Sequence, residues 1–305
     1  MGTREDLARV CKFTELDPSD HDSLLLSPSS PSAPCSMPYA HCELIAGDIL
    51  DEKLATKTAE GIDVIVHLAA NAEVSASVEN SKMDCMTNVL GTLNYLEAAR
   101  INRVGKFIFA SSVAPIGECD TAIHEEMAPH PVSPYGASKL AGEAYCSAYY
   151  RTFGIETIAL RFGNVYGPGS SHKSSVVAKF IRQAMRGETL EIYGDGRQTR
   201  DFICIDDLIQ AICLAATRDG IGGETFQIAT NTETTVSELV DKLLSILAES
   251  GFKDVEVHHI APRLGDVRRN FSDTSKAKRM LGWQVQIDLS NGLKRTVEWF
   301  IQLKN

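Results

Sequence analysis

Short apolar runs alternate with longer stretches of helical periodicity through the first half of this 305-residue chain, and this alternation limits the folds open to it. The apolar runs occupy residues 43–46, 64–68, 106–110 and 156–161, and the helical patterns occupy residues 81–100 and 135–153. Apolar runs of this length are typical of buried strands. Because strands that alternate with helices build a parallel sheet covered on both faces, we predict an α/β protein.

The pattern becomes more mixed after residue 166. Helical runs at 176–186, 205–217, 236–250 and 289–302 are interspersed with short strands near 190–193, 224–228 and 255–259. We predict a smaller, substrate-facing α+β lobe that packs on the carboxyl edge of the sheet. The predicted division assigns residues 41–165 and parts of 195–230 to the sheet domain, and residues 166–194 and 231–305 to the lobe.

Residues 1–40 differ in composition from the rest. Twelve of the twenty-one positions from Pro18 to Pro38 are serine or proline, and no glycine occurs between Gly2 and Gly47. Proline removes backbone donors and serine competes for backbone hydrogen bonds. We therefore predict a short helix at 5–13, followed by a disordered segment or loose loop.

Charge and cysteine usage exclude several classes of function. The net charge is −10 and no lysine/arginine block occurs, which argues against a nucleic-acid partner. No apolar run approaches the ~18 residues of a membrane span, and the acidic amino terminus is unlike a secretory signal. Eight scattered cysteines without a Cys-x-x-Cys pair favour reduced thiols and a cytoplasmic location, with disulfides as the alternative. The histidines show no metal-ligand spacing, so we predict no metal site.

Tyr135 and Lys139 stand four residues apart at the head of a predicted helix, so their side chains share one face. A free tyrosine has a pKa of about 10, and lowering it by ~3 units needs about 4 kcal/mol of preferential phenolate stabilisation. A nearby ammonium and a positively charged cofactor ring are able to supply this. The pair is therefore a candidate general base for a substrate hydroxyl.

A second hydroxyl lies where the predicted strand at 106–110 ends. Ser112 follows this strand, and ligands bind at the carboxyl ends of parallel strands. Serine at a strand end is otherwise an ordinary turn residue. Together Ser112, Tyr135 and Lys139 suggest proton abstraction coupled to hydride transfer.

Eight motifs in one order resemble the NAD-dependent nucleotide-sugar epimerase/dehydratase family of extended short-chain dehydrogenases/reductases, with the UDP-sugar 4-epimerases the most similar kind. They lie at residues 47–49, 67–70, 88–92, 111–112, 135–139, 161–167, 200–202 and 263–266. The resemblance implies a Rossmann-like parallel sheet with a smaller substrate lobe, NAD as cofactor and a UDP-sugar as substrate. It also implies a homodimer that pairs through the helices bearing Tyr135 and Asn88.

The resemblance assigns roles to individual positions. Tyr135 and Lys139 would contact NAD together with Asp48, Ile49, Leu68, Ala69, Ala70 and Asn88. The substrate would meet Ser112, Asn164, Arg200, Arg263 and Asp266. Arginine suits a diphosphate because its planar fork can grip two oxygens, and a chain of net charge −10 must place such charge locally. For Arg200, a surface ion pair with Asp201 is the alternative.

One part of the family pattern is absent. The family begins with a strand, a Gly-x-x-Gly-x-x-Gly loop and a helix, which bring backbone N–H groups to the pyrophosphate. This chain has the Ser/Pro-rich segment instead, so the first βαβ unit is absent or replaced. We therefore expect the chain to bind NAD weakly or not at all.

The residues after Ser112 bear on the reaction. Positions 113–116 are Val, Ala, Pro and Ile, without the carboxylate that family dehydratases and decarboxylases carry there. This favours 4-epimerisation by transient oxidation at C4 and return of the hydride to the opposite face. Asn270, at the position that gates the sugar 2-substituent in the family, suggests tolerance of N-acetylated sugars. There are two alternatives to a 4-epimerase. One is another dehydratase or reductase of the family, and the other is a non-catalytic remnant that binds a nucleotide sugar or a partner.

Overall fold

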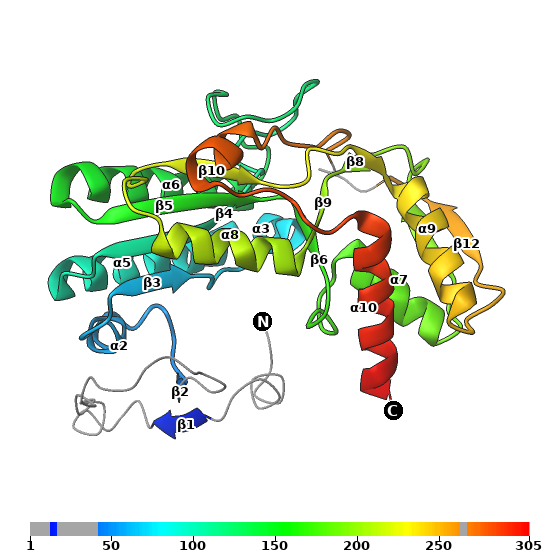
Figure 1. Ribbon diagram of the computed structural model, residues 1–305, viewed down its shortest axis with the longest axis horizontal. Helices are drawn as coiled ribbons and strands as arrows, with labels where there is room; N and C mark the ends of the chain where they lie inside the picture. The colour runs from blue at the N-terminus through cyan, green and yellow to red at the C-terminus, as the bar shows by residue number, and fades with distance from the viewer. Residues whose placement is uncertain (1–12, 17–41, 263–266, 305) are drawn as a thin grey trace.

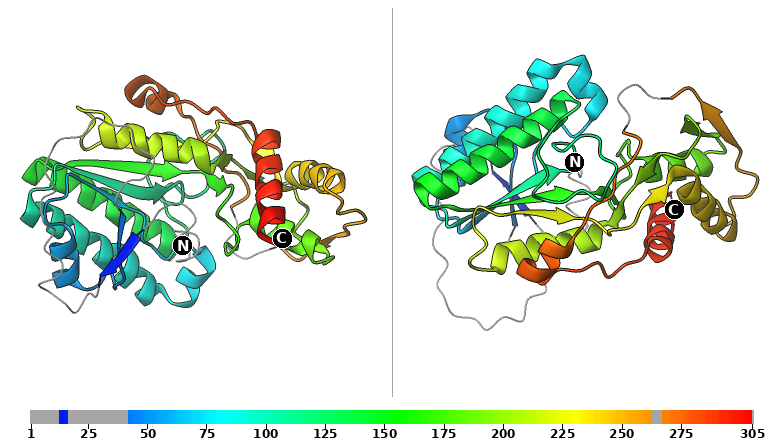
Figure 2. Two further views of the ribbon diagram at one scale, coloured as in Figure 1. Left: turned by 60° about the horizontal axis from the view of Figure 1, so that its bottom comes forward. Right: turned by 90° about the horizontal axis from the view of Figure 1, so that it is seen from above.

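A computed structural model describes residues 13–16, 42–262 and 267–304, and its centre is a four-stranded parallel sheet (Figure 1). The strands lie in the order β10-β5-β4-β3. Helices cover both faces, with α5 and α6 on one side and α8 on the other (Figure 2). The bounds are β3 (Val64–His67), β4 (Lys106–Ser112), β5 (Glu156–Phe162), β10 (Thr225–Ile228), α5 (Gly91–Asn102), α6 (Pro134–Phe153) and α8 (Ile205–Thr217).

Alternating side chains of the central strands divide the core into two layers. Phe107 and Phe109 of β4 pack with Leu96 of α5 on one face. Ile108, between them, packs with Leu208 of α8 on the other face. This is the pattern of a strand buried on both sides, and it confirms the parallel α/β arrangement predicted from the apolar runs.

The predicted helix at 81–100 is interrupted in the structure. It consists of α4 (Ser81–Cys85), a π-helical turn η1 (Met86–Leu90) and the first residues of α5. A π turn inserts one residue into the helix and is often found at functional sites. Two short helices, α2 (Glu52–Thr58) and α3 (Val74–Glu79), are additional to the predicted elements.

A separate pair of parallel strands, β1 (Phe13–Leu16) and β2 (Cys42–Ile45), precedes the sheet. The predicted helix at 5–13 lies outside the described residues except for Phe13, which belongs to β1. The strand at 13–16 differs from the predicted loop, because β2 offers it a backbone partner in register with Cys42. Among the described residues, β3 is hydrogen-bonded to a strand on one side, that of β4.

The other elements of the second half of the chain, apart from η2 (Ala277–Leu281), which packs against α8 and β10, form a lobe beyond the carboxyl end of β5 (Figure 2). Its core joins residues of α7, β7, β9, α9 and α10, including Leu190, Leu243 and Leu293. The bounds are β6 (Asn164–Tyr166), α7 (Val176–Met185), β7 (Leu190–Tyr193), β8 (Thr199–Arg200), β9 (Phe202–Cys204), β11 (Thr234–Thr235), α9 (Val236–Glu249), β12 (Val257–Ile260), η2 (Ala277–Leu281) and α10 (Leu289–Lys304). The strand pairs are β6–β9 and β7–β12, both parallel, and the antiparallel β8–β11.

Candidate active site

Ser112, Tyr135 and Lys139 meet where β4 ends beside the amino terminus of α6. The helix begins at Pro134 because Ser133 caps it, its Oγ accepting from the Gly136 N–H at 3.1 Å. The buried Lys139 ammonium donates to the Ala110 carbonyl at 2.8 Å and lies 5.9 Å from the centre of the Tyr135 ring. The predicted trio is therefore assembled at the carboxyl end of a central strand.

Burial dominates the electrostatics of this trio. It lowers the pKa of Lys139 to about 8, although the Asp84 and Glu143 charges act in the opposite direction. Burial also raises the pKa of Tyr135, while a hydrogen bond with Ser112 lowers it. The lowered tyrosine pKa is not found in the protein by itself, because desolvation outweighs the hydrogen bond with Ser112. The lowering expected with a positively charged cofactor ring in place stays a prediction.

The neighbouring residue of β4 is also fixed to α6. Ser111 donates to Glu143 Oε1 at 2.5 Å, and Arg161 of β5 binds the same carboxylate through Nε at 2.8 Å and Nη2 at 2.7 Å. All three side chains are buried. Successive residues of β4, Ala110 and Ser111, thus hold successive turns of α6, and this sets the position of Ser112 against Tyr135.

Asn88 lies in the π turn and clasps the loop that follows β3. Its Oδ1 accepts from the Asn71 N–H at 2.7 Å, and its Nδ2 lies 3.0 Å from the Asn71 carbonyl. Nδ2 is also within hydrogen-bond distance of Asp84 Oδ1 and Ser138 Oγ. The Asn88 amide is engaged inside the protein, so contact with a cofactor stays a prediction, whereas support of the loop is observed.

The other predicted cofactor positions line this side of the sheet. Leu68 is 56% exposed, and Ala69 and Ala70 are partly exposed. Asp48 forms a local turn, with Oδ1 accepting from the Leu50 N–H. Ile49 is fastened to α5, because its carbonyl accepts from Asn94 at 3.0 Å.

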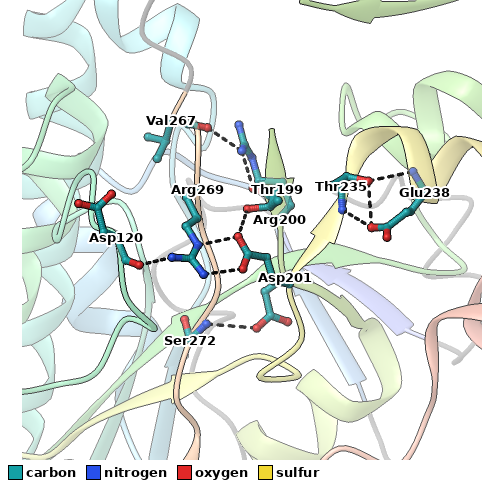
Figure 3. Close-up of polar contacts among 10 residues, drawn as sticks. Asp120, Thr199, Arg200, Asp201, Thr235, Glu238, Val267, Arg269 and Ser272 are labelled. Atoms are coloured by element: carbon teal, nitrogen blue, oxygen red, sulfur yellow. Dashed lines mark hydrogen bonds and ion pairs between the residues drawn. The ribbon is translucent and has the colours of Figure 1, made fainter. Parts of the chain in front are cut away.

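The lobe presents the predicted substrate residues on segments that are tied together (Figure 3). Arg200 Nη1 donates to the carbonyls of Thr199 and Val267, at 2.6 and 2.7 Å. Asp201 points inward, where its carboxylate accepts from Thr230 and from the Ser272 N–H. Asn164 begins β6 and pairs with Phe202. Arg263 and Asp266 lie outside the described residues.

A pocket of about 340 Å³ lies among these segments. Arg269 links them: it grips the Glu233 carboxylate through Nε at 2.7 Å and Nη2 at 2.8 Å, and donates to the Asp120 carbonyl. The pocket is lined by Glu118, Cys119, Asp120, Arg197, Thr199, Glu233, Arg268 and Arg269. Because acidic and basic side chains both line it, the pocket is polar.

No group of three or more histidine, cysteine or acidic side chains that could hold a metal ion occurs within the described ranges. None of the helices in this part of the chain combines the length and apolar character needed to cross a bilayer.

Several residues of the site were not predicted from the sequence. Asp84 and Ser138 contact Asn88, Glu143 acts on Lys139 through its charge, and Arg161 binds Glu143. Helical spacing was the available signal: Asp84 stands four residues before Asn88, and Glu143 four residues after Lys139.

Residues 12–229 match the model of the NAD dependent epimerase/dehydratase family. The chain belongs to this family. A UDP-glucose 4-epimerase of Mycolicibacterium smegmatis is 37% identical over 263 residues, covering 85% of this chain and 82% of that protein.

Solved structures of family members agree with the Rossmann-like α/β fold. A UDP-glucose 4-epimerase of Thermotoga maritima, solved with UDP-glucose, has a TM-score of 0.80 at 36% identity, over 86% of each chain. A dTDP-glucose 4,6-dehydratase of Streptomyces venezuelae, solved with NAD, has a TM-score of 0.79 at 32% identity, over 86% of this chain and 80% of that one. NAD is thus the cofactor of this epimerase/dehydratase family.

The residues beside the ends of β3 and β4 are compatible with a bound NAD. Small side chains at Ala69 and Ala70 allow close approach, and the Lys139 ammonium has donors beyond the one given to Ala110. The pyrophosphate half is served less well, because no Gly-x-x-Gly-x-x-Gly sequence occurs in the chain.

Proposed function

We propose that this chain is a nucleotide-sugar 4-epimerase that acts on UDP-glucose and UDP-galactose or on their N-acetyl forms. The assembly of Ser112, Tyr135 and Lys139 at the end of β4 is the observation that carries the proposal. The epimerases among its relatives support it.

Each side chain has a distinct role in this proposal. Tyr135 takes the proton of the sugar 4-hydroxyl and returns it, and Ser112 orients the same oxygen. Lys139 binds the nicotinamide ribose and favours the phenolate through its charge. NAD, when bound, supplies a hydride acceptor that gives the hydride back. Leu68, Ala69, Ala70, Asn88, Asp48 and Ile49 line the cofactor side.

The surroundings of Ser112 favour epimerisation over dehydration. Val113 and Ile116 are buried with Ile123 in a small apolar cluster, and Ser112 Oγ accepts from the Ala114 N–H at 3.2 Å. An elimination of water needs an added acid and base, and residues 113–116 bring no carboxylate. A dehydratase or reductase of the family is the alternative enzyme.

Arg200 and Arg263 are proposed to bind the diphosphate, with Asn164 and Asp266 on the nucleotide and sugar. The hydrogen bond from Arg200 to the Val267 carbonyl supports this, because Val267 directly follows Asp266 in the sequence and stands four residues after Arg263. Ordered guanidinium groups lose less entropy when they bind phosphate.

A non-catalytic nucleotide-sugar-binding protein is the second candidate function. The missing glycine-rich loop favours it, as does the edge of β3 without a strand partner among the described residues. Binding of UDP-glucose without any binding of NAD would separate this candidate from the epimerase.

We further propose a cytoplasmic homodimer. Ile101 of α5 and Tyr145, Tyr150 and Phe153 of α6 are large apolar side chains exposed on neighbouring helices, which suits pairing with a second copy. Cysteines 85, 119, 146, 204 and 213 are free thiols, as expected in a reducing compartment. Sedimentation equilibrium would test the dimer.

The function is tested by incubating the protein with UDP-galactose and millimolar NAD and separating the UDP-sugars by chromatography. The epimerase proposal expects UDP-glucose to form without net NADH. A stable keto product would indicate the dehydratase, and net oxidation or reduction of the nucleotide would indicate the reductase. No turnover despite binding of UDP-sugar and NAD would overturn the enzyme proposal.

A further inference from the structure

Asp84 is a buried carboxylate that the roles described above leave unused. It lies in α4, which packs against α6, and the residue is 1% exposed. Its Oδ1 accepts from Asn88 Nδ2 at 2.8 Å. Its Oδ2 is buried and has no hydrogen-bond partner among the described residues. A buried charged oxygen in this state is unfavourable unless another charge compensates it.

The contacts of Asp84 lead to the first turn of α6. Asn88 Nδ2 also lies 3.1 Å from Ser138 Oγ, and Ser138 donates to the Tyr135 carbonyl at 2.9 Å. The Tyr135 N–H in turn donates to Ser77 Oγ at 3.2 Å. The turn that carries the candidate base is therefore held from the side of α4 and the π turn.

Lys139 is the cation whose charge acts on Asp84. The titratable groups that act with it are Tyr135, Glu143 and Cys146 of α6, Asp84 of α4 and His67 of β3. Two of these groups are carboxylates. Glu143 is already bound at both oxygens by Arg161, at 2.8 and 2.7 Å. Within the described residues Asp84 has no ion pair of this kind, and its charge acts on Lys139.

We propose that Asp84 is a positioning residue of the candidate epimerase centre, providing the negative charge opposite the Lys139 ammonium and orienting, through Asn88 and Ser138, the turn that bears Tyr135. This inference rests on the proposed function, because it takes Tyr135 and Lys139 as the working pair. The geometry gives Asp84 both duties at once, one by charge and one by hydrogen bonding.

The titration behaviour follows from this arrangement. The Asp84 charge raises the pKa of Lys139 against the lowering effect of burial. Burial raises the pKa of Asp84 itself, whereas Ser138 and the Lys139 charge lower it. Asp84→Asn keeps an oxygen for Asn88 but removes the charge, so it separates the two duties.

The experiment follows lysine Nζ and Cε signals by NMR in protein labelled at lysine, with Lys139→Arg to assign the signal. We expect Asp84→Asn to lower the pKa of Lys139 by about one pH unit. Glu79→Gln, an exposed carboxylate on the adjacent α3, is the charge-matched control and should leave it unchanged. Asp84→Glu keeps the charge, so the pKa of Lys139 in this variant should stay close to its wild-type value.

An unchanged Lys139 pKa in Asp84→Asn would overturn the proposal. If that variant does not fold, Asp84→Ser tests the same charge with a smaller side chain. The NMR result needs no turnover, so it stands apart from the assay of the proposed function. Where the wild type turns over, the decline of kcat at alkaline pH should shift to lower pH by the same number of pH units in Asp84→Asn. A uniform loss of kcat at every pH would contradict the charge role.

Discussion

Tyr135 illustrates how a single side chain depends on what is bound beside it. Its pKa is raised by burial and lowered by Ser112, so the phenol is protonated in the protein alone. A positively charged ring beside the hydroxyl would act in the opposite direction. In the proposed mechanism the residue therefore becomes a base at neutral pH once cofactor and substrate are in place.

Removing the Tyr135 hydroxyl should abolish proton transfer but leave binding intact. We expect Tyr135→Phe to lower kcat by about a thousandfold, within the range of general base catalysis, with UDP-sugar affinity unchanged within a few fold. Tyr145→Phe, at an exposed position of the same helix, is the control. The test measures kcat with saturating NAD and the affinity for UDP-glucose by calorimetry. Full turnover in Tyr135→Phe would show that Tyr135 is not the base.

His67 should make the fold sensitive to acid. Thr92 donates its hydroxyl hydrogen to the Asn88 carbonyl at 2.6 Å, so the His67 Nε2, 3.1 Å away, is the donor to Thr92. Burial and the Lys139 charge lower the pKa of His67 to about 4. Between pH 6.5 and 4 the unfolded chain takes up a proton here that the folded protein does not, so stability falls as the pH falls.

The size of this effect can be measured by urea unfolding at several pH values. The wild type should lose about 3 kcal/mol more than His67→Phe between pH 7 and pH 4. The exposed His172→Phe should keep the wild-type slope. Equal slopes for wild type and His67→Phe would contradict a neutral buried histidine.

At the scale of elements, β4 and α6 are held together by polar contacts as well as by apolar packing. Lys139 reaches the Ala110 carbonyl, and Glu143 joins Ser111 of β4 to Arg161 of β5. Gly142 permits this close approach, because a Cβ there would lie 2.3 Å from the Phe109 ring. The register of helix against strand is thus fixed at several points.

Breaking the buried ion pair should destabilise the fold strongly. Glu143→Gln leaves the Arg161 charge buried without a counter-charge, and we expect a loss of about 3 kcal/mol in the free energy of unfolding. Glu191→Gln, which breaks the more exposed pair with Lys179, should lose less than about 1 kcal/mol. Urea denaturation measures both, and equal losses would refute the distinction.

Most elements could be predicted from periodicity, whereas the interruption near Asn88 could not. The predicted run at 205–217 coincides with α8, because its apolar residues recur at helical spacing. The helix ends at Thr217, and Arg218 caps it. The run at 81–100 has the same kind of spacing, but it contains a π turn, in which Asn88 binds the backbone of the distant Asn71. A contact between a helix and a loop of another segment leaves no periodic signal.

At the scale of the whole molecule, the proximity of Ser112, Tyr135 and Lys139 could be predicted because motifs in a fixed order carry them. The placement of Asp84 and Arg161 was not predicted, since it depends on how α4 and β5 pack against α6. A surface ion pair with Asp201 was the alternative for Arg200, yet the fold turns the Asp201 carboxylate inward to bind Thr230 and Ser272. Charge patterns along a chain do not reveal which way such a side chain will point.

The binding of NAD tests the architecture as a whole. No Gly-x-x-Gly-x-x-Gly sequence occurs in the chain to bring backbone N–H groups to the pyrophosphate, so calorimetric titration should show no binding in the micromolar range. UDP-glucose titrated into the same preparation is the control for an intact lobe. Micromolar NAD affinity would mean that other residues of the chain replace the loop.

The outer edge of β3 has a consequence for the behaviour of the protein in concentrated solution. Among the described residues no strand covers this edge, and Val66 is 39% exposed on it. Uncovered backbone groups of this kind template strand addition from neighbouring molecules, and the net charge of −10 is the force that keeps those molecules apart. Raising the salt concentration screens that repulsion. Light scattering should therefore record growing aggregates as sodium chloride increases, and handling the protein at low ionic strength should preserve it.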